Sequence, residues 1–301
     1  MTPPTAPGKI VGLGTSAIGG LYEDLGDATA RATLEAAWAA GTRYFDTAPH
    51  YGTGVAERRL GKFLRDKPRA EFTVSSKVGR LLRPGEDGLV RVRDYSADGV
   101  YASLADSLDR TGLDRFDTLF IHDPDDFWET AVGAAYPALA RLRDEGAVRR
   151  IGVGMNEPKM PARFVAETDV DCVLIAGRYT LLDRSAADEL LPLCETRRVE
   201  VIAGGVFNSG VLADPGPDAR FDYLPVPPDV RARVEALAAA CARHGVALPA
   251  AALQFPLRHK AVTAMVIGAR TPAEVEQNAA HLATAIPDAL WSEIDGLTVS
   301  R

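Results

Sequence analysis

Cysteine is scarce in this chain, and its distribution argues against two common kinds of cross-link. The 301 residues include three cysteines, Cys172, Cys194 and Cys241, which are odd in number and widely spaced. A disulfide framework or a zinc site needs paired or clustered thiols. We therefore expect free or buried thiols in a reducing, cytoplasmic environment.

Long apolar runs and an excess of basic residues are also missing. No run approaches the roughly 18 apolar residues of a membrane span, and residues 1–8 contain no basic region followed by an apolar stretch. We therefore expect no membrane association and no secretion signal. Lysine and arginine total 34 against 41 acidic residues, a net charge of −7. This balance argues against a nucleic-acid partner, so we expect a small-molecule substrate and a monomer or homodimer.

The sequence does contain a regular alternation of strand-like and helix-like segments. The strand-like segments are continuous apolar runs, which are typical of strands buried on both faces of a parallel sheet. They are residues 9–14, 43–46, 72–77, 118–122, 151–155, 173–176, 199–203 and 262–267. Helical patterns lie at 28–40, 96–110, 129–145, 185–197, 228–244 and 272–283. Repeated βα units form either an open doubly wound sheet or a closed barrel.

The number of units favours the barrel. Eight βα units in about 270 residues match a (β/α)8 barrel, and no Ser/Gly-rich linker divides the chain. We therefore predict an α/β fold consisting of a single (β/α)8 TIM barrel domain over residues 1–301. The longest non-helical insertions, residues 80–95 and 207–227, follow strands. On a barrel they lie at the C-terminal face, where substrates bind.

The first strand-like segment runs into a glycine motif that imitates a dinucleotide-binding fingerprint. Residues 12–17 match G-x-G-x-x-A, and Glu35 lies at a suitable distance for a ribose-binding acid. A Rossmann site also needs a helix to begin at the glycines. Here the helical pattern begins only near Asp27, and Glu35 falls inside it. The sequence therefore favours a strand-end turn that lines a site.

Four polar residues lie at or just after the ends of three consecutive predicted strands: Asp46, Tyr51, Lys77 and His122. Each alone is typical of a solvated, capping or hydrogen-bonded structural residue. Together they lie on three βα units whose strands end at the same face of a barrel. The nearby cluster Asp123, Asp125 and Asp126 has no histidine or cysteine at ligand spacing, so we predict no metal site.

These four residue types can exchange a proton during hydride transfer. A phenol titrates near 10, which is too high for proton exchange at neutral pH, and a neighbouring lysine ammonium favours its phenolate. An aspartate keeps the lysine charged and positioned. A histidine across the pocket can orient the reacting oxygen. The sequence thus predicts Tyr51 as a general acid/base at a carbonyl or alcohol oxygen.

The chain resembles the aldo-keto reductases over almost its whole length. Residues 45–52 (FDTAPHYG) look like the family's Asp/Tyr signature, Ser76-Lys77 like its lysine motif and Ile121-His122 like its histidine motif. The resemblance implies a (β/α)8 barrel, a catalytic tetrad of Asp46, Tyr51, Lys77 and His122, and a nicotinamide cofactor, NAD or NADP, bound without a Rossmann motif.

The resemblance also implies a set of cofactor-binding residues near the strand ends. Asn156 stands where relatives bind the nicotinamide carboxamide, and Gln277 and Asn278 lie where relatives bind the adenine. The complete set comprises Gly14, Thr15, Ser16, Asp46, Asn156, Tyr179, Gly204, Val206, Phe207, Asn208, Gly210, Ile267, Gly268, Ala269, Arg270, Glu274, Gln277 and Asn278.

Three positions depart from the family pattern. Ala176 replaces a glutamine, and Gly204 replaces a tyrosine that stacks on the nicotinamide, which leaves Phe207 as the candidate ring. Glu274 replaces an arginine of NADPH-specific relatives, and a carboxylate repels a 2′-phosphate. Arg270 argues the other way, because it could reach that phosphate. On balance we expect a preference for NAD over NADP.

Residues 122–126, 205–210 and 253–259 are similar to the subgroup that contains aldose 1-dehydrogenases and pyridoxal dehydrogenases. By this resemblance the enzyme oxidises an aldose at C1 to a lactone. The expected substrate-binding residues are Tyr22, Tyr51, Arg80, His122, Phe127 and Trp128, although Phe127 and Trp128 equally fit packing at a helix start. The alternatives are an NADPH-dependent aldehyde, ketone or pyridoxal oxidoreductase, and a non-catalytic cofactor-binding regulatory subunit.

Overall fold

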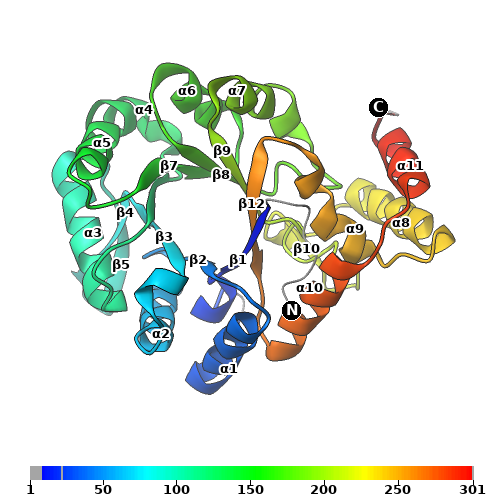
Figure 1. The fold of residues 1–301 in the computed structure, drawn as a ribbon, viewed down its shortest axis with the longest axis horizontal. Helices are drawn as coiled ribbons and strands as arrows, with labels where there is room; N and C mark the ends of the chain where they lie inside the picture. Colours follow the sequence, from blue (N-terminus) through cyan, green and yellow to red (C-terminus); the bar gives the residue numbers. More distant parts are fainter. Residues whose placement is uncertain (1–8, 22, 300–301) are drawn as a thin grey trace.

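Eight parallel strands form a closed barrel in the computed structural model, which describes residues 9–21 and 23–299 (Figure 1). Around the barrel the order is β1-β12-β9-β8-β7-β6-β3-β2, and β2 closes onto β1. The strands are β1 (Ile10–Gly14), β2 (Tyr44–Asp46), β3 (Thr73–Val78), β6 (Thr118–His122), β7 (Arg150–Met155), β8 (Cys172–Ala176), β9 (Glu200–Gly204) and β12 (Val262–Gly268). The predicted (β/α)8 barrel is confirmed, and each predicted strand agrees within one residue at either end.

Helices surround the barrel and cover its outer face (Figure 1). Those predicted from sequence are α1 (Gly26–Ala39), α3 (Ala97–Thr111), α5 (Tyr136–Asp144), α7 (Leu190–Arg197), α8 (Pro228–Arg243) and α10 (Pro272–Ala283). Four further helices were not predicted from the sequence: α2 (Val55–Leu64), α6 (Lys159–Glu167), α9 (Leu248–Gln254) and α11 (Asp288–Val299). Pro161 and Pro249 obscured α6 and α9, although proline is tolerated in the first turn of a helix.

The predicted continuous helix over residues 129–145 is wrong in its first half. The structure has a short helix α4 (Trp128–Thr130), then π-helical turns at Ala131–Ala135, and only then α5. Pro137 lies in the first turn of α5 and has no N–H to donate to the preceding turn. A wider turn before it accommodates the missing hydrogen bond.

Large side chains fill the barrel interior because small residues stand beside them. Tyr44, Phe120 and Leu174 lie in this interior cluster. A Cβ at Gly12 would lie 2.6 Å from Tyr44 Cδ1, so only glycine admits the tyrosine ring. Outside the strands, a larger apolar cluster joins the barrel to the helices. The three cysteines are free and buried, as predicted.

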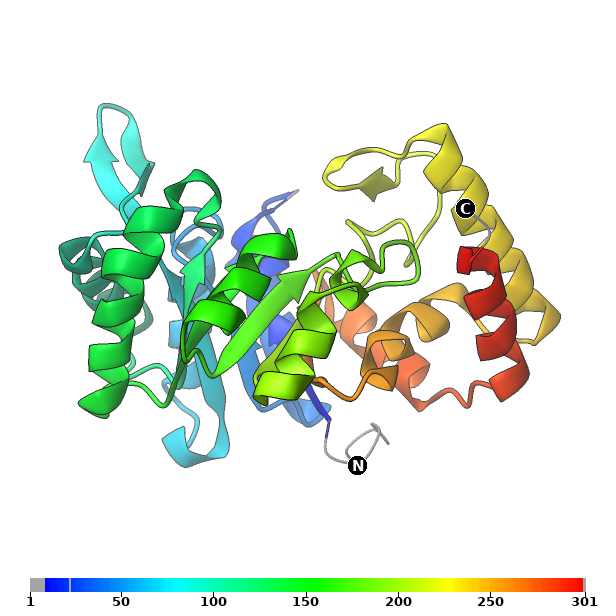
Figure 2. The same ribbon diagram turned by 90° about the horizontal axis from the view of Figure 1, so that it is seen from above.

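Two β-hairpins rise from the barrel at the end opposite the start of β1 (Figure 2). The first pairs β4 (Arg80–Gly85) with β5 (Gly88–Arg93), and the second pairs β10 (Arg220–Phe221) with β11 (Leu224–Pro225). They occupy the two long insertions that the sequence placed at the C-terminal face. The hairpins thus stand beside the mouth of the barrel.

Within the described residues no single helix is long and apolar enough to cross a bilayer. Helix α8 and the segment 248–258 together have the length and composition of a membrane span, but they are bent by 100° relative to each other. Helix α8 and α9 are part of an apolar cluster in the helical layer. In the same part of the chain, no group of three or more His, Cys, Asp or Glu residues is arranged to hold a metal ion.

Candidate active site

Parallel strand direction brings the four predicted catalytic residues to one end of the barrel. Asp46 and His122 are the last residues of β2 and β6, and Lys77 lies one residue before the end of β3. All three are buried, with 2%, 7% and 2% of their surface exposed respectively. Tyr51 lies in the turn between β2 and α2. Gly52 allows this turn to approach the short 3₁₀ helix Ala17–Gly19, because a Cβ there would lie 1.8 Å from the Gly19 carbonyl oxygen.

A buried ion pair forms the base of the site. Lys77 Nζ lies 2.6 Å from Asp46 Oδ2 and also donates to the Thr47 carbonyl oxygen at 3.0 Å. Ser75 Oγ donates to Asp46 Oδ1 at 2.6 Å. Despite its burial, the pKa of Lys77 is raised by the charge of Asp46. The lysine is therefore a fixed positive charge in a site with little water.

The Tyr51 ring lies beside this charge, with Lys77 Nζ 4.9 Å from the ring centroid. Burial raises the pKa of Tyr51 to about 12, and the charge and hydrogen bond of Lys77 oppose that rise. The lowering effect predicted for the lysine is present, but burial outweighs it. At neutral pH the phenol in this structure is protonated, and Lys77 limits the free-energy cost of forming the phenolate.

His122 completes the group as a neutral imidazole. Its ring centroid lies 6.2 Å from that of Tyr51, and the rings are almost perpendicular. Burial and the charges of Lys77 and Arg80 hold its pKa well below the ordinary value. His122 Nδ1 is buried without a hydrogen-bond partner among the described residues. The proton therefore belongs on Nε2, a donor that lies 3.5 Å from Asp123 Oδ2 in this structure.

The predicted substrate residues divide between the mouth and the helical layer. Arg80 lies at the mouth but is ion-paired with Asp123 at 3.0 Å and Asp125 at 3.5 Å. The Phe127 ring packs on Tyr95, with centroids 5.1 Å apart. Trp128 packs against Phe164 of α6 with centroids 4.9 Å apart, and Arg163 lies over its ring.

Trp128 therefore takes the packing role that the sequence had left open. Tyr22 lies outside the described residues. Tyr95 was not singled out from the sequence, yet its hydroxyl donates to the carbonyl oxygens of His122 and Asp123 at 2.8 and 2.7 Å. A lone tyrosine after a hairpin carries no sequence signal for such a role.

Several predicted cofactor residues lie together at the ends of β7, β8 and β9. Asn156 directly follows β7 and is exposed, and Gly204 ends β9. Asn208 is buried with a positive φ of 46°, and its Nδ2 donates to the Gly177 carbonyl oxygen at 3.1 Å. Val206 is buried in the apolar core, and Phe207 and Gly210 belong to the same loop. Asn208 Oδ1 has no partner among the described residues and remains available to a ligand's N–H.

Tyr179 does not join this group. Its ring lies 5.1 Å from the ring of Phe255, which follows α9, and 5.7 Å from that of His259. Both contacts belong to the helical layer beside the start of β12. These contacts show Tyr179 packed on other rings, and its role in cofactor binding stays a prediction.

Arg178 links loops around the predicted site and was not singled out from the sequence. It directly follows Gly177, its Nε donates to the Asn156 carbonyl oxygen at 2.8 Å, and it forms ion pairs with Asp222 at 3.0 Å and Asp183 at 3.3 Å. It therefore ties together the loops after β7, β8 and β9. Arginine in a loop is usually a solvated surface residue, so its position alone did not single it out.

The remaining predicted cofactor residues lie at the ends of β1 and β12. These strands are paired, with Gly14 opposite Gly268. The residues after Gly14 form a loop and the 3₁₀ helix Ala17–Gly19, and α1 begins only at Gly26. The Rossmann interpretation is therefore excluded, as the sequence analysis preferred. Thr15 Oγ1 is buried without a partner among the described residues.

Helix α10 begins beside this strand end, and its first turn holds the Arg270–Glu274 pair. Thr271 caps the helix by accepting a hydrogen bond from the Glu274 N–H at 3.2 Å. The Glu274 carboxylate accepts from the Arg270 N–H at 2.8 Å and from its Nε at 2.9 Å. Gln277 is exposed and Asn278 is half-buried on the same helix.

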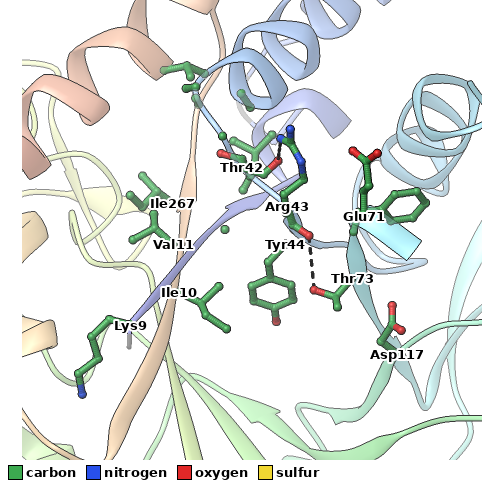
Figure 3. A pocket seen from close by; sticks show the side chains of 18 of the residues that line it. Lys9, Ile10, Val11, Thr42, Arg43, Tyr44, Glu71, Thr73, Asp117 and Ile267 are labelled. Atoms are coloured by element: carbon green, nitrogen blue, oxygen red, sulfur yellow. Dashed lines mark hydrogen bonds between the residues drawn. The ribbon is translucent and has the colours of Figure 1, made fainter. Parts of the chain in front are cut away.

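A separate cavity lies at the other end of the barrel. It has a volume of about 720 Å³ and is lined at the starts of β1, β2 and β3 and on α1 and α10. Figure 3 shows Lys9, Thr42, Arg43 and Thr73 around it. None of the four tetrad residues lines this cavity. Arg43 is engaged there with the carbonyl oxygens of Trp38 and Thr42, both at 2.8 Å. A search guided by the volume of this cavity would therefore miss the tetrad at the strand ends.

Comparisons with known proteins agree with this geometry. The Aldo/keto reductase family model matches residues 10–298. A D-threo-aldose 1-dehydrogenase of Pseudomonas sp is 45% identical over 94% of this chain and 92% of its own length. A pyridoxal 4-dehydrogenase of Microbacterium luteolum is 39% identical with the same two coverages.

Solved structures show the same fold. A glycerol dehydrogenase from Gluconobacter oxydans superposes with a TM-score of 0.78 at 25% identity, covering 96% of this chain and 91% of that chain. An aldo/keto reductase from Klebsiella pneumoniae, solved in complex with NADP and acetate, has a TM-score of 0.69 at 23% identity, covering 95% and 90%. The chain belongs to the aldo/keto reductase family and is an oxidoreductase.

Proposed function

We propose that this enzyme oxidises an aldose at C1 to the lactone with an NAD(P) cofactor, and that Tyr51 is its general acid/base. The observation that carries the proposal is the buried Asp46–Lys77 pair beside the Tyr51 ring, with neutral His122 facing it. The 45% identity to a D-threo-aldose 1-dehydrogenase supports the substrate class.

The residues present fit a nicotinamide cofactor. Buried, unpartnered polar atoms lie at both ends of the predicted binding region, on Thr15 after β1 and on Asn208 after β9. Asn156 and Phe207 lie near the nicotinamide end in this proposal, and Arg270, Gln277 and Asn278 near the adenosine end. When bound, the nicotinamide supplies the carbon that exchanges hydride with substrate C1.

Residues of the chain itself transfer the proton of the substrate hydroxyl and position the reacting oxygen. The Tyr51 phenolate, favoured by Lys77, takes the proton of the C1 hydroxyl while C1 loses hydride and its bond to oxygen becomes a carbonyl. His122 donates from Nε2 to the same oxygen and orients it. Asp46 keeps Lys77 charged and in place. In the reverse direction the Tyr51 phenol returns the proton.

We infer a preference for NAD from the Arg270–Glu274 pair. The sequence left Arg270 as an argument for NADP, since it could bind a 2′-phosphate. In the structure the Arg270 side chain is ion-paired with Glu274 at 2.8 Å. The pair presents a carboxylate that can accept from a free ribose hydroxyl and repels a phosphate.

The identity to a pyridoxal 4-dehydrogenase favours a second candidate, a pyridoxal or other aldehyde oxidoreductase. It would use the same tetrad and differ in the loops around the mouth. A non-catalytic regulatory subunit is disfavoured, because such a protein does not need a paired lysine beside a buried tyrosine.

The test replaces the Tyr51 hydroxyl. Tyr51→Phe should lower kcat for aldose oxidation by about 10²- to 10⁴-fold, followed as reduced cofactor absorbance with NAD or NADP. Tyr101→Phe is the matched control, because Tyr101 is exposed on α3 away from the site. Full activity in Tyr51→Phe would exclude the mechanism, and wild-type turnover of pyridoxal but of no aldose would favour the second candidate.

A further inference from the structure

His50 stands at the mouth of the site and has no role in the mechanism above. It precedes Tyr51 in the turn after β2, and its ring centroid lies 5.9 Å from that of His122 in an almost perpendicular arrangement. Its side chain is half-buried. The His122 ring thus has the His50 ring on one side and, at 6.2 Å, the Tyr51 ring as a second neighbour.

The two ring nitrogens of His50 have different surroundings. Nδ1 is buried and has no hydrogen-bond partner among the described residues. Nε2 is not among these buried, unpartnered atoms and makes no hydrogen bond in the described part of the chain, so it is accessible to a molecule outside the chain. A neutral imidazole carries its proton on one nitrogen, and a buried unpaired N–H is costly. The proton therefore belongs on Nε2, which makes the open nitrogen a donor.

The first hairpin keeps this ring neutral and in place. Arg91 of β5 donates to the His50 carbonyl oxygen at 3.2 Å. Burial and the charges of Arg91, Arg80 and Arg93 lower the pKa of His50 to about 4. At neutral pH His50 is thus a single, fixed donor and carries no charge.

We propose that His50 is a specificity-determining residue that donates a hydrogen bond from Nε2 to a hydroxyl oxygen on the substrate carbon next to the reacting carbon. Tyr51 and His122 hold the reacting oxygen, so the adjacent His50 ring faces the next substituent of the substrate. An aldose or any other 2-hydroxy aldehyde carries an oxygen there, whereas a simple aldehyde such as propanal carries only hydrogen and carbon. This inference rests on the proposed roles of Tyr51 and His122.

The experiment measures a selectivity ratio in both reaction directions. In oxidation, kcat/KM for ribose is divided by that for 2-deoxyribose. In reduction, kcat/KM for glyceraldehyde is divided by that for propanal. His50→Phe keeps an aromatic ring without a donor, and we expect both ratios to fall about five- to tenfold, the effect of one neutral hydrogen bond. His50→Gln places an amide N–H near the position of Nε2 and should retain most of the selectivity.

Controls separate this role from a structural one. His244→Phe removes an imidazole on the far side of α8, where it pairs with Glu293, and should leave both ratios unchanged. Unchanged ratios in His50→Phe, or equal losses of selectivity in His50→Phe and His50→Gln, would overturn the proposal. A wild-type enzyme that oxidises no aldose would refute the proposed function, while the glyceraldehyde and propanal pair would still decide the role of His50.

Discussion

Tyr51 is a phenol whose acidity is set by two opposing effects, and this determines how the rate should depend on pH. Its pKa of about 12 leaves it protonated at neutral pH, so the fraction of phenolate rises tenfold per pH unit. Oxidation needs the phenolate and reduction needs the phenol. We therefore expect kcat for oxidation to rise with a slope of one on a logarithmic plot from about pH 6 to about pH 9, while kcat for reduction stays flat. A plateau in oxidation below about pH 9 would contradict this assignment.

Glu274 holds the side chain of Arg270, which could bind a 2′-phosphate at the start of α10. Glu274→Gln removes the negative charge and releases Arg270 from its ion pair. We expect the ratio of kcat/KM with NADP to kcat/KM with NAD to rise about tenfold, as for one charge-assisted contact. Glu276→Gln is the control, because Glu276 is an exposed carboxylate on the same helix. An unchanged ratio in Glu274→Gln would show that the pair does not face the ribose.

At the scale of elements, Arg178 connects the three loops that follow β7, β8 and β9. Its pair with Asp222 holds the turn of the β10–β11 hairpin, and its bond to the Asn156 carbonyl oxygen holds the end of β7. These side-chain contacts add to the backbone bridge between Gly210 and Arg220 in anchoring the hairpin. Such loops open locally at low free-energy cost.

Arg178→Met should therefore loosen the loop after β9. We expect trypsin to cleave after Arg220 about fivefold faster than in the wild type, as expected for losing partly exposed ion pairs, and the KM for the cofactor to increase. Mass spectrometry of the fragments measures the cleavage rate. Glu200→Gln is the control, because it breaks the Arg150–Glu200 pair at the starts of β7 and β9. Equal cleavage in both variants would refute the anchoring role.

At the scale of the whole molecule, buried neutral histidines make stability depend on pH. The pKa of His122 lies well below its ordinary value of 6.5 because of burial and the charges of Lys77 and Arg80. Below pH 6.5 the unfolded chain binds a proton that the native protein does not. The free energy of unfolding should therefore fall as pH decreases, by up to about 1.4 kcal/mol per pH unit for this group.

The pKa values of His50, His259 and His281 are also lowered, so these residues also decrease the free energy of unfolding as the pH falls. Their contribution is smaller because solvent screens their partly exposed rings. We expect urea midpoints to fall between about pH 7 and about pH 5, and to fall less steeply in His122→Gln. We also propose that the chain is one barrel domain, so a single unfolding transition should be seen. A steeper fall in His122→Gln would contradict the assignment.

The sequence by itself was sufficient to predict the barrel and the four residues at its mouth. Buried parallel strands are continuous apolar runs, so their ends could be read to within one residue. Because parallel strands end at one face of a barrel, the sequence also predicts that Asp46, Lys77 and His122 lie close together. Short helices such as α6 and α9 were missed, because prolines in their first turns resemble loop signals.

Only the tertiary structure decided which way individual side chains face and which partners they take. Trp128 and Tyr179 turn toward Phe164 and Phe255, and neither residue spacing nor composition shows such a direction. Arg178, Tyr95 and the open nitrogen of His50 depend on contacts between loops that are far apart in sequence. A strand's direction follows from local periodicity, whereas a side chain's partner depends on where other segments of the chain come to lie.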